Sequence, residues 1–180
     1  PGLTLQTRTL IDEQIEQDLD AGIADMAIGP AKAVAKRFSY KPLFEEPFAC
    51  IARSGHPILG DDLTLEKYLA CNHAMVAHRW DGLGVVDTAL AKLGLSRNVA
   101  VCVANFASVP SLIMATDLIS VLPQNVAAKV RDELPLIMFE LPFEIPSVEV
   151  KLIWGKGSSR SPMQKWFRDL VISAAEEHCC

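Results

Sequence analysis

Residues 43–57 read Leu-Phe-Glu-Glu-Pro-Phe-Ala-Cys-Ile-Ala-Arg-Ser-Gly-His-Pro, two short apolar segments that run into a turn. The apolar residues on either side of Pro47 predict two strands, over 38–44 and 48–52, because proline interrupts a strand ladder. Gly55, His56 and Pro57 then predict a turn, and a short helix is expected over 64–69. Residues 116–123, Thr-Asp-Leu-Ile-Ser-Val-Leu-Pro, form a second segment in which a predicted strand leads into a helix.

The rest of the chain alternates strands of this length with helices. Further strands are predicted over 3–7, 23–28, 74–77, 99–103, 118–122, 136–140 and 148–154. Helices are predicted from Thr9 to a stop at Gly22, from Val85 to a stop at Gly94, from about Ser108, over 124–130, and from a cap at Ser161 to the C-terminal region. Such alternation favours an α/β fold with sheets rich in parallel strands.

Composition excludes several classes of protein. The chain has 180 residues, half of them hydrophobic, which is enough for one domain or two small lobes. A net charge of −5 without a basic face argues against nucleic-acid binding by these residues alone. No apolar run approaches the roughly 20 residues of a membrane span, and no secretory signal is visible. The five cysteines contain no Cys-x-x-Cys pair, which favours a reducing, cytoplasmic setting.

Motifs that would indicate catalysis or a bound cofactor are missing from the sequence. There is no Gly-x-Ser-x-Gly elbow, and Gly82-Leu83-Gly84 is too short for a dinucleotide fingerprint. His73 and His178 have no Cys, His or Asp partners at the spacing of metal ligands. We therefore expect no enzyme activity, no cofactor and no metal.

Several segments, in their order and spacing, resemble the effector-binding domain of LysR-type transcriptional regulators. The resemblance rests on residues 19–28 (L-x-x-G-x-x-D-x-A-I in the family), 43–46 (P-L-x-x-E), 55–57 (H-P-L), 116–123, and the aromatic positions Trp154 and Trp166. The segments at 56–57, 105–106 and 116–123 look most like the subgroup that contains nodulation regulators and regulators of aromatic catabolism. Its effectors include flavonoids, salicylate-like acids and substituted aromatics.

The resemblance implies a type 2 periplasmic-binding-protein-like fold, with two α/β lobes joined by two crossing hinge strands. Lobe I would comprise residues 1–55 and 152–180, and lobe II residues 56–151. A small effector, aromatic or acidic, would bind in the cleft between the lobes, outside the carboxyl ends of strands. Family members also pair through these domains, so a homo-oligomer, a dimer or tetramer, is expected.

The sequence departs from the family pattern at its start. The winged helix-turn-helix and linker helix are missing, as are the first strand and first helix of lobe I, so the resemblance implies an N-terminally truncated domain. DNA would be bound only through the missing N-terminal domain. The strands predicted near 3–9 and 23–28 would also lose their common neighbour in the sheet.

Three segments are candidates for contact with the effector. His78, Arg79 and Trp80 follow the strand at 74–77, where Arg and His supply donors for a carboxylate or phenol; the alternative is a solvent-exposed loop. Asn105 and Phe106 follow the strand at 99–103 and precede a helix; the alternative is helix capping and core packing. Ile28, Gly29 and Pro30 end a lobe I strand where glycine permits close approach; the alternative is a plain turn.

Two other functions remain open at this point. A transport-type solute-binding protein of the same fold would need an export signal or a lipid anchor. An enzyme on a related two-lobe scaffold would need a nucleophile and a base that converge in the cleft. The sequence upstream of Pro1 would distinguish the regulator from the transport protein.

Overall fold

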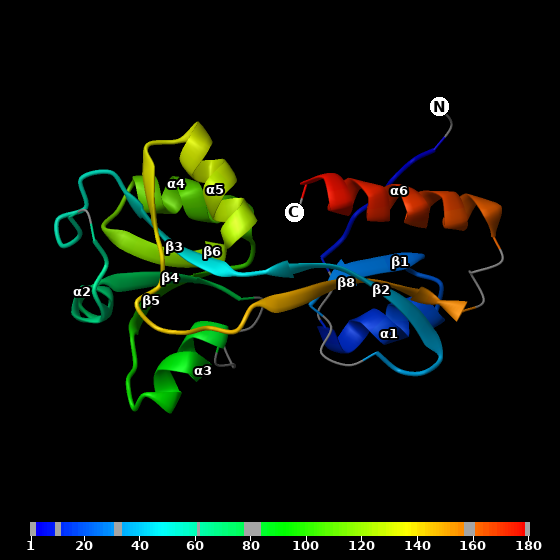
Figure 1. The fold of residues 1–180 in the computed structure, drawn as a ribbon, viewed down its shortest axis with the longest axis horizontal. Helices are drawn as coiled ribbons and strands as arrows, with labels where there is room; N and C mark the ends of the chain where they lie inside the picture. The colour runs from blue at the N-terminus through cyan, green and yellow to red at the C-terminus, as the bar shows by residue number, and fades with distance from the viewer. Residues whose placement is uncertain are drawn as a thin grey trace. The chain divides into compact units, whose positions relative to one another are not determined.

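The computed structural model describes residues 3–9, 12–30, 34–60, 62–77, 84–156 and 161–178. The chain divides into two compact units, unit 1 (residues 1–45 and 148–180) and unit 2 (residues 46–147), and it passes from one to the other twice (Figure 1). The sequence placed these passages at 55/56 and 151/152. The first passage falls earlier because strand β2 (Phe38–Glu46) and strand β3 (Phe48–Arg53) lie in different sheets on either side of Pro47.

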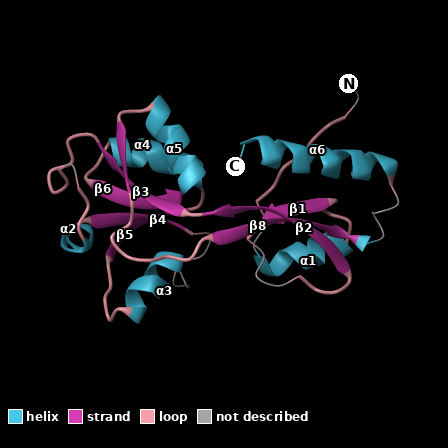
Figure 2. Ribbon diagram, in the orientation of Figure 1, coloured by secondary structure: helices cyan, strands magenta, loops and turns pink. Residues whose placement is uncertain are grey.

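Unit 1 is built on a three-stranded sheet of order β1-β8-β2. Besides β2, its elements are α1 (Asp12–Asp20), β1 (Met26–Gly29), β8 (Val148–Gly155) and α6 (Pro162–His178). β1 runs antiparallel to β8, with Met26 opposite Trp154. Helices α1 and α6 cover opposite faces of this sheet (Figure 2). The core on the α1 side contains Ile15, Leu19, Ala27, Phe38 and Ile153.

The predicted strand over 3–7 is wrong. Residues 3–9 have no regular secondary structure, and Leu3 and Leu5 are 49% and 62% exposed. The alternation of apolar and polar residues was correct for a strand, but a strand forms only where a partner accepts its backbone hydrogen bonds. The predicted helix that follows is present as α1, and it ends as expected at Gly22, whose φ is +66°.

Unit 2 is built on a five-stranded sheet of order β5-β4-β6-β3-β7. Its other strands are β4 (Asn72–Val76), β5 (Asn98–Val103), β6 (Leu118–Pro123) and β7 (Leu136–Phe139). Its helices are α2 (Leu65–Ala70), α3 (Val85–Lys92), the 3-10 helix η1 (Phe106–Ser108), α4 (Val109–Met114) and α5 (Gln124–Glu133). β4 is parallel to β5 and β6, whereas β3 is antiparallel to β6 and β7. Within the described residues of unit 2, the expectation of sheets rich in parallel strands therefore holds for β5, β4 and β6 and not for β3 and β7.

Strand β3 lies inside the sheet of unit 2, between β6 and β7. Along β3, Ala49 and Ile51 pack under α4 and α5, while Cys50 and Ala52 face α2 and α3 on the other side of the sheet (Figure 1). Because both faces of β3 are covered, the strand is a continuous apolar run rather than an alternating one.

The turn after β3 is held by a buried histidine. His56 Nδ1 accepts hydrogen bonds from the backbone N–H groups of Ile58 and Leu59, at 3.3 and 3.4 Å. Its Nε2 lies 2.9 Å from the carbonyl oxygen of Asp117, so Nε2 carries the proton and donates. The side chain of Asp117 accepts from Arg53. His56 thus ties the end of β3 to the start of β6.

Candidate functional site

The strands that precede two of the three candidate segments end side by side in unit 2. Strands β4 and β5 are parallel, and Val76 lies opposite Val103 at their carboxyl ends. The N–H of Ala77 donates to the carbonyl oxygen of Val103 at 3.0 Å. His78, Arg79 and Trp80 follow Ala77 directly but lie outside the described residues. The carboxyl ends of β4 and β5 are therefore joined by hydrogen bonding.

Asn105 caps the 3-10 helix that it precedes. Its Oδ1 accepts from the backbone N–H of Ser108 at 3.1 Å and from the Ser108 hydroxyl at 3.0 Å. Its own backbone is extended, as a cap requires. The capping interpretation is therefore correct for this oxygen, and in the described part of the chain Nδ2 makes no hydrogen bond.

Phe106 is not a core residue. It is the first residue of η1 and is 42% exposed, whereas Val109, Pro110 and Ile113 after it are buried. Core packing therefore does not explain an aromatic side chain at this position. An exposed ring beside polar groups is a surface on which a small planar molecule can stack.

Ile28, Gly29 and Pro30 lie in unit 1, at and after the end of β1. Ile28 is 57% exposed beside Leu152, and Gly29 pairs with Lys151. A methyl group at Gly29 would meet nothing within 4 Å, and the φ of Gly29 is not in the left-handed region. Neither backbone conformation nor packing of the described residues requires glycine here.

A buried ion pair in unit 2 joins the first turn of α3 to the residue before β5, and sequence reasoning missed it. Arg97 Nε donates to Asp87 Oδ1 at 2.8 Å and Nη2 donates to Oδ2 at 3.0 Å, and the Arg97 side chain is only 2% exposed. Asp87 Oδ2 also accepts from the N–H of Gly84 at 3.1 Å. The available signal was an acidic residue three positions after a glycine that precedes an apolar run, which is a helix-start pattern.

Burial and charge shift the pKa values around this pair. Burial of Asp87 works to raise the pKa of its carboxyl, but hydrogen bonding and attraction to Arg97 outweigh it and leave the pKa lowered. Burial likewise opposes the charge on Arg97, yet the bond to Asp87 leaves its pKa raised. His73 packs on the Tyr68 ring with centroids 4.5 Å apart, and burial, together with the charge of Arg97, lowers the pKa of His73 to about 4. The pair is ionised and His73 is neutral at pH 7.

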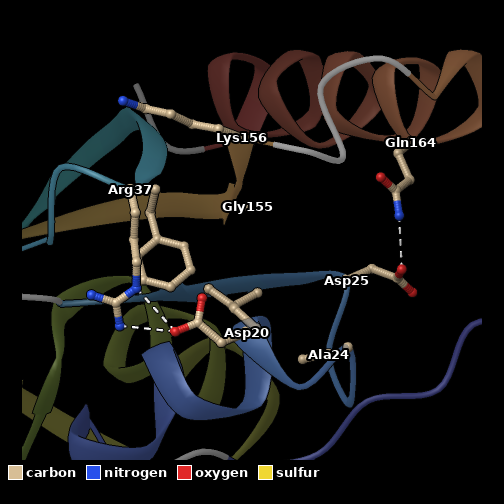
Figure 3. A pocket seen from close by; sticks show the side chains of 10 residues that line it. Asp20, Ala24, Asp25, Arg37, Gly155, Lys156 and Gln164 are labelled. Carbon is tan, nitrogen blue, oxygen red and sulfur yellow. Dashed lines mark hydrogen bonds and ion pairs between the residues drawn. The ribbon is translucent and has the colours of Figure 1, made fainter.

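Unit 1 contains a separate polar pocket of about 320 Å³ (Figure 3). Arg37 lines this pocket. Its Nε and Nη2 each donate to Asp20 Oδ2 at 2.9 Å, and Nη2 also donates to Glu16 at 3.0 Å. The pKa of Arg37 is raised, chiefly by its hydrogen bond to Asp20. The guanidinium also covers the ring of Phe38 at 4.7 Å. None of the five candidate residues that the structure describes lines this pocket.

Gln164, in the first turn of α6, faces the same pocket from the opposite side (Figure 3). The Ser161 hydroxyl accepts from its backbone N–H at 3.4 Å, as the predicted cap requires. Its side-chain Nε2, however, donates to Asp25 at 2.8 Å, and its Oε1 has no partner among the described residues. Gln164 therefore does not return a hydrogen bond to the backbone of Ser161, as it would in a capping box, and instead joins α6 to the residue before β1.

Two kinds of feature are absent from the described residues. Within these residues, no group of three or more His, Cys, Asp or Glu side chains is arranged to hold a metal ion. The described helices include none that combines the length and apolarity needed to cross a membrane.

Comparison with known proteins gives one consistent family. A family model described as the LysR substrate binding domain matches residues 1–176. The HTH-type transcriptional regulator SyrM 1 of Sinorhizobium fredii (strain NBRC 101917 / NGR234) is 33% identical over 176 residues, which are 97% of this chain and 51% of that protein. The chain thus spans about half the length of the curated relatives that it matches.

Solved structures agree with the fold. A putative transcriptional regulator from Vibrio parahaemolyticus superposes with a TM-score of 0.83 at 21% identity, over 94% of this chain and 78% of that one. The effector binding domain of QuiR, solved in complex with shikimate, gives a TM-score of 0.70 at 17% identity, over 92% and 78%. These likenesses confirm the expected type 2 periplasmic-binding-protein-like fold.

Proposed function

The chain belongs to the family of LysR substrate-binding domains, and on this premise we propose that it senses a small aromatic or acidic effector for a DNA-binding transcriptional regulator. In this proposal unit 2 supplies part of the binding site, through the segments that follow β4 and β5. The DNA-binding function would belong to a helix-turn-helix part of the regulator, as the name of the SyrM 1 relative suggests.

The observation that carries the proposal is the junction of the two strand ends, where Ala77 N–H donates to the Val103 carbonyl. Small molecules bind outside the carboxyl ends of strands in open α/β sheets. Here that edge leads to an exposed aromatic ring, Phe106, and to an amide, Asn105, whose oxygen is already committed to Ser108. The remaining amide donor and the ring suit a planar molecule with a hydrogen-bond acceptor such as a carboxylate.

One structural neighbour suggests the chemical class of the effector. The QuiR effector binding domain, which has the same fold, was solved in complex with shikimate, a small acid. For this chain, we extend the same proposal to aromatic carboxylates and phenols. The candidate His78 and Arg79 would pair with an acidic group, with Trp80 beside them.

A thermal-shift screen with benzoate, salicylate, shikimate and simple phenols tests the proposal, followed by calorimetry on the compounds that raise the melting temperature. Phe106→Ala should weaken binding by about 0.5–1.5 kcal/mol beyond the lost contact area. Met114→Ala is a matched control, because Met114 is 41% exposed at the end of α4 and is not a candidate.

The outcomes separate clearly. Weaker binding by Phe106→Ala with unchanged binding by Met114→Ala supports an effector site at the carboxyl ends of β4 and β5. Equal affinity in both variants would place the site elsewhere, and a screen in which no compound stabilises the domain would contradict the proposed effector class.

A further inference from the structure

The polar pocket of unit 1 contains a buried hydrogen-bond acceptor that has no partner among the described residues. This acceptor is Oε1 of Gln164, in the first turn of α6. The orientation of the amide is fixed, because Nε2 donates to Asp25 at 2.8 Å and an ionised carboxylate only accepts hydrogen bonds. Leaving a buried acceptor unbonded destabilises the free protein, so a ligand that donates to Oε1 removes a cost that the fold otherwise carries.

Asp25 supplies a negative charge beside this acceptor. Oε1 shares a carbon atom with Nε2, so it lies close to the carboxylate that Nε2 contacts. Among the described residues, no Lys, Arg or His forms an ion pair with Asp25, and its Oδ2 accepts no hydrogen bond. An uncharged acceptor and a carboxylate without a counter-charge therefore line the same pocket.

The cationic side chains that line the pocket do not offset this charge. Arg37 donates to both Asp20 and Glu16, so its own charge is already balanced. Lys156 is exposed, and its amino group extends away from Gln164 (Figure 3). The side of the pocket next to Gln164 is therefore rich in acceptors and carries a negative charge.

Apolar side chains complete the lining of the pocket. Leu19 and Phe38 are buried, and Ala24 is half-buried. The volume of about 320 Å³ falls at the lower end of the range for small-molecule sites, about 300–1,000 Å³. A ligand that suits these walls has a small apolar body and a positively charged group with N–H donors.

We propose that this pocket binds a small primary amine as its ammonium ion, with one N–H donated to Gln164 Oε1 and another to the Asp25 carboxylate. An ammonium has three donors and no acceptor, so it satisfies both groups at once. A neutral hydroxyl has one donor and no charge, so it meets only one of the two requirements. The site lies within unit 1 and does not depend on the effector site proposed in unit 2, so it gives the domain a second small-molecule site.

Titration of the nitrogen-15-labelled, unmodified chain with benzylamine tests the proposal by NMR at pH 7, where the amine is protonated. Backbone amide signals of residues 20–25, 155 and 164 should shift in a saturable way. Benzyl alcohol lacks the charge, whereas benzyltrimethylammonium keeps the charge but has no N–H donor. Each of these two compounds should bind at least about tenfold more weakly than benzylamine, as expected for the loss of a charge-assisted hydrogen bond.

Two variants then assign the contacts. Asp25→Asn removes the charge at nearly constant shape, and Gln164→Leu removes the amide oxygen, so each should weaken benzylamine binding about tenfold. Asp169→Asn is the matched control, because it removes the same charge from an exposed pair with Lys165 on α6, outside the pocket. Benzylamine should bind this control as it binds the unmodified chain.

The results that overturn the proposal are specific. They are the absence of saturable shifts, shifts at the ends of β4 and β5 in place of the pocket, and equal affinity for the three compounds. An equal loss of affinity in Asp169→Asn and Asp25→Asn would assign binding to the general charge of the unit and would also overturn it. The comparison of the three compounds uses the unmodified chain alone, so it decides the proposal even where a variant fails to fold. None of these results bears on the effector site proposed in unit 2.

Discussion

Asn105 uses its side-chain oxygen to cap η1, while its Nδ2 makes no hydrogen bond to the described residues. Its Oδ1 accepts two hydrogen bonds from Ser108. Asn105→Ala should therefore lower the free energy of unfolding by about 1 kcal/mol, the usual cost of losing an N-cap. Asn105→Asp keeps the acceptor and should leave stability nearly unchanged. Urea unfolding measures both variants, and equal losses would mean that capping by the side-chain oxygen contributes nothing.

The same pair of variants separates capping from binding. Asn105→Asp replaces the amide donor by a negative charge, so it should weaken the binding of an acidic effector while the fold stays as stable. Calorimetry with any carboxylate that binds the unmodified domain checks this. Undiminished affinity in Asn105→Asp would remove the amide from the proposed site.

His73 predicts a dependence of stability on pH. Its pKa in the folded protein is about 4, lowered mainly by burial, against about 6.5 in an unfolded chain. Between these two pKa values, His73 is protonated in the unfolded state but not in the folded state. The free energy of unfolding therefore falls as the pH drops below 6.5. The slope from this residue should approach about 1.4 kcal/mol per pH unit. Above pH 6.5 its contribution is constant.

A comparison with His73→Gln isolates this effect. Glutamine keeps a donor for the Tyr68 carbonyl, to which His73 Nε2 is bonded at 3.0 Å, and it takes up no proton. The free energies of unfolding of both proteins can be measured by chemical unfolding between pH 4 and 8. The difference between them should be smaller at pH 4 than at pH 8. A constant difference would show that His73 is protonated equally in both states.

Individual residues at the site also show which features the sequence predicts and which it does not. The cap at Asn105 was one of the alternatives that local spacing left open, whereas the exposure of Phe106 was not predicted. The pair between Asp87 and Arg97 joins residues ten positions apart through the packing of α3 against the sheet. Local spacing identifies Asp87 as a helix-start residue but cannot name Arg97 as its partner.

At the scale of elements, glycine ends two helices through its backbone. Gly94, after α3, has φ +71° and open space around it. Gly94→Ala should therefore lower the free energy of unfolding by about 1 kcal/mol, from backbone strain alone. Gly29→Ala is the control, because Gly29 has equally open surroundings without a positive φ. Thermal unfolding of both variants compares them, and equal stability of the two would argue against strain at Gly94.

Most elements were predictable from the sequence, because helix stops, prolines and apolar runs act locally. The break at Pro47, the helix stops at Gly22 and Gly94 and the strand before α4 are all where the sequence placed them. The errors concern pairing. The apolar alternation at Leu3 and Leu5 lacks a partner strand among the described residues, and the antiparallel neighbours of β3 come from distant parts of the chain. Pairing is set by long-range contacts that a periodic pattern does not encode.

At the scale of the whole molecule, unit 1 differs from unit 2 in the apolar surface it exposes. Met163, Trp166 and Leu170 fall on one stripe of α6 and are 61%, 55% and 49% exposed. β1 is also an edge strand of its sheet. Contiguous apolar surface and an open strand edge both favour contact with another chain. We therefore expect copies of this chain to associate through unit 1.

Trp166→Glu should weaken this association, because it places a charge in the middle of the stripe. Burying one such side chain contributes about 1.5–3 kcal/mol, so its loss should raise the dissociation constant by at least tenfold. Leu93→Glu is the control, since Leu93 is 56% exposed at the end of α3 in unit 2. Sedimentation velocity over a range of protein concentrations measures both. If the unmodified chain is a monomer at every concentration, the expected association is refuted. If both variants raise the dissociation constant equally, the effect comes from the added charge and not from loss of the α6 stripe.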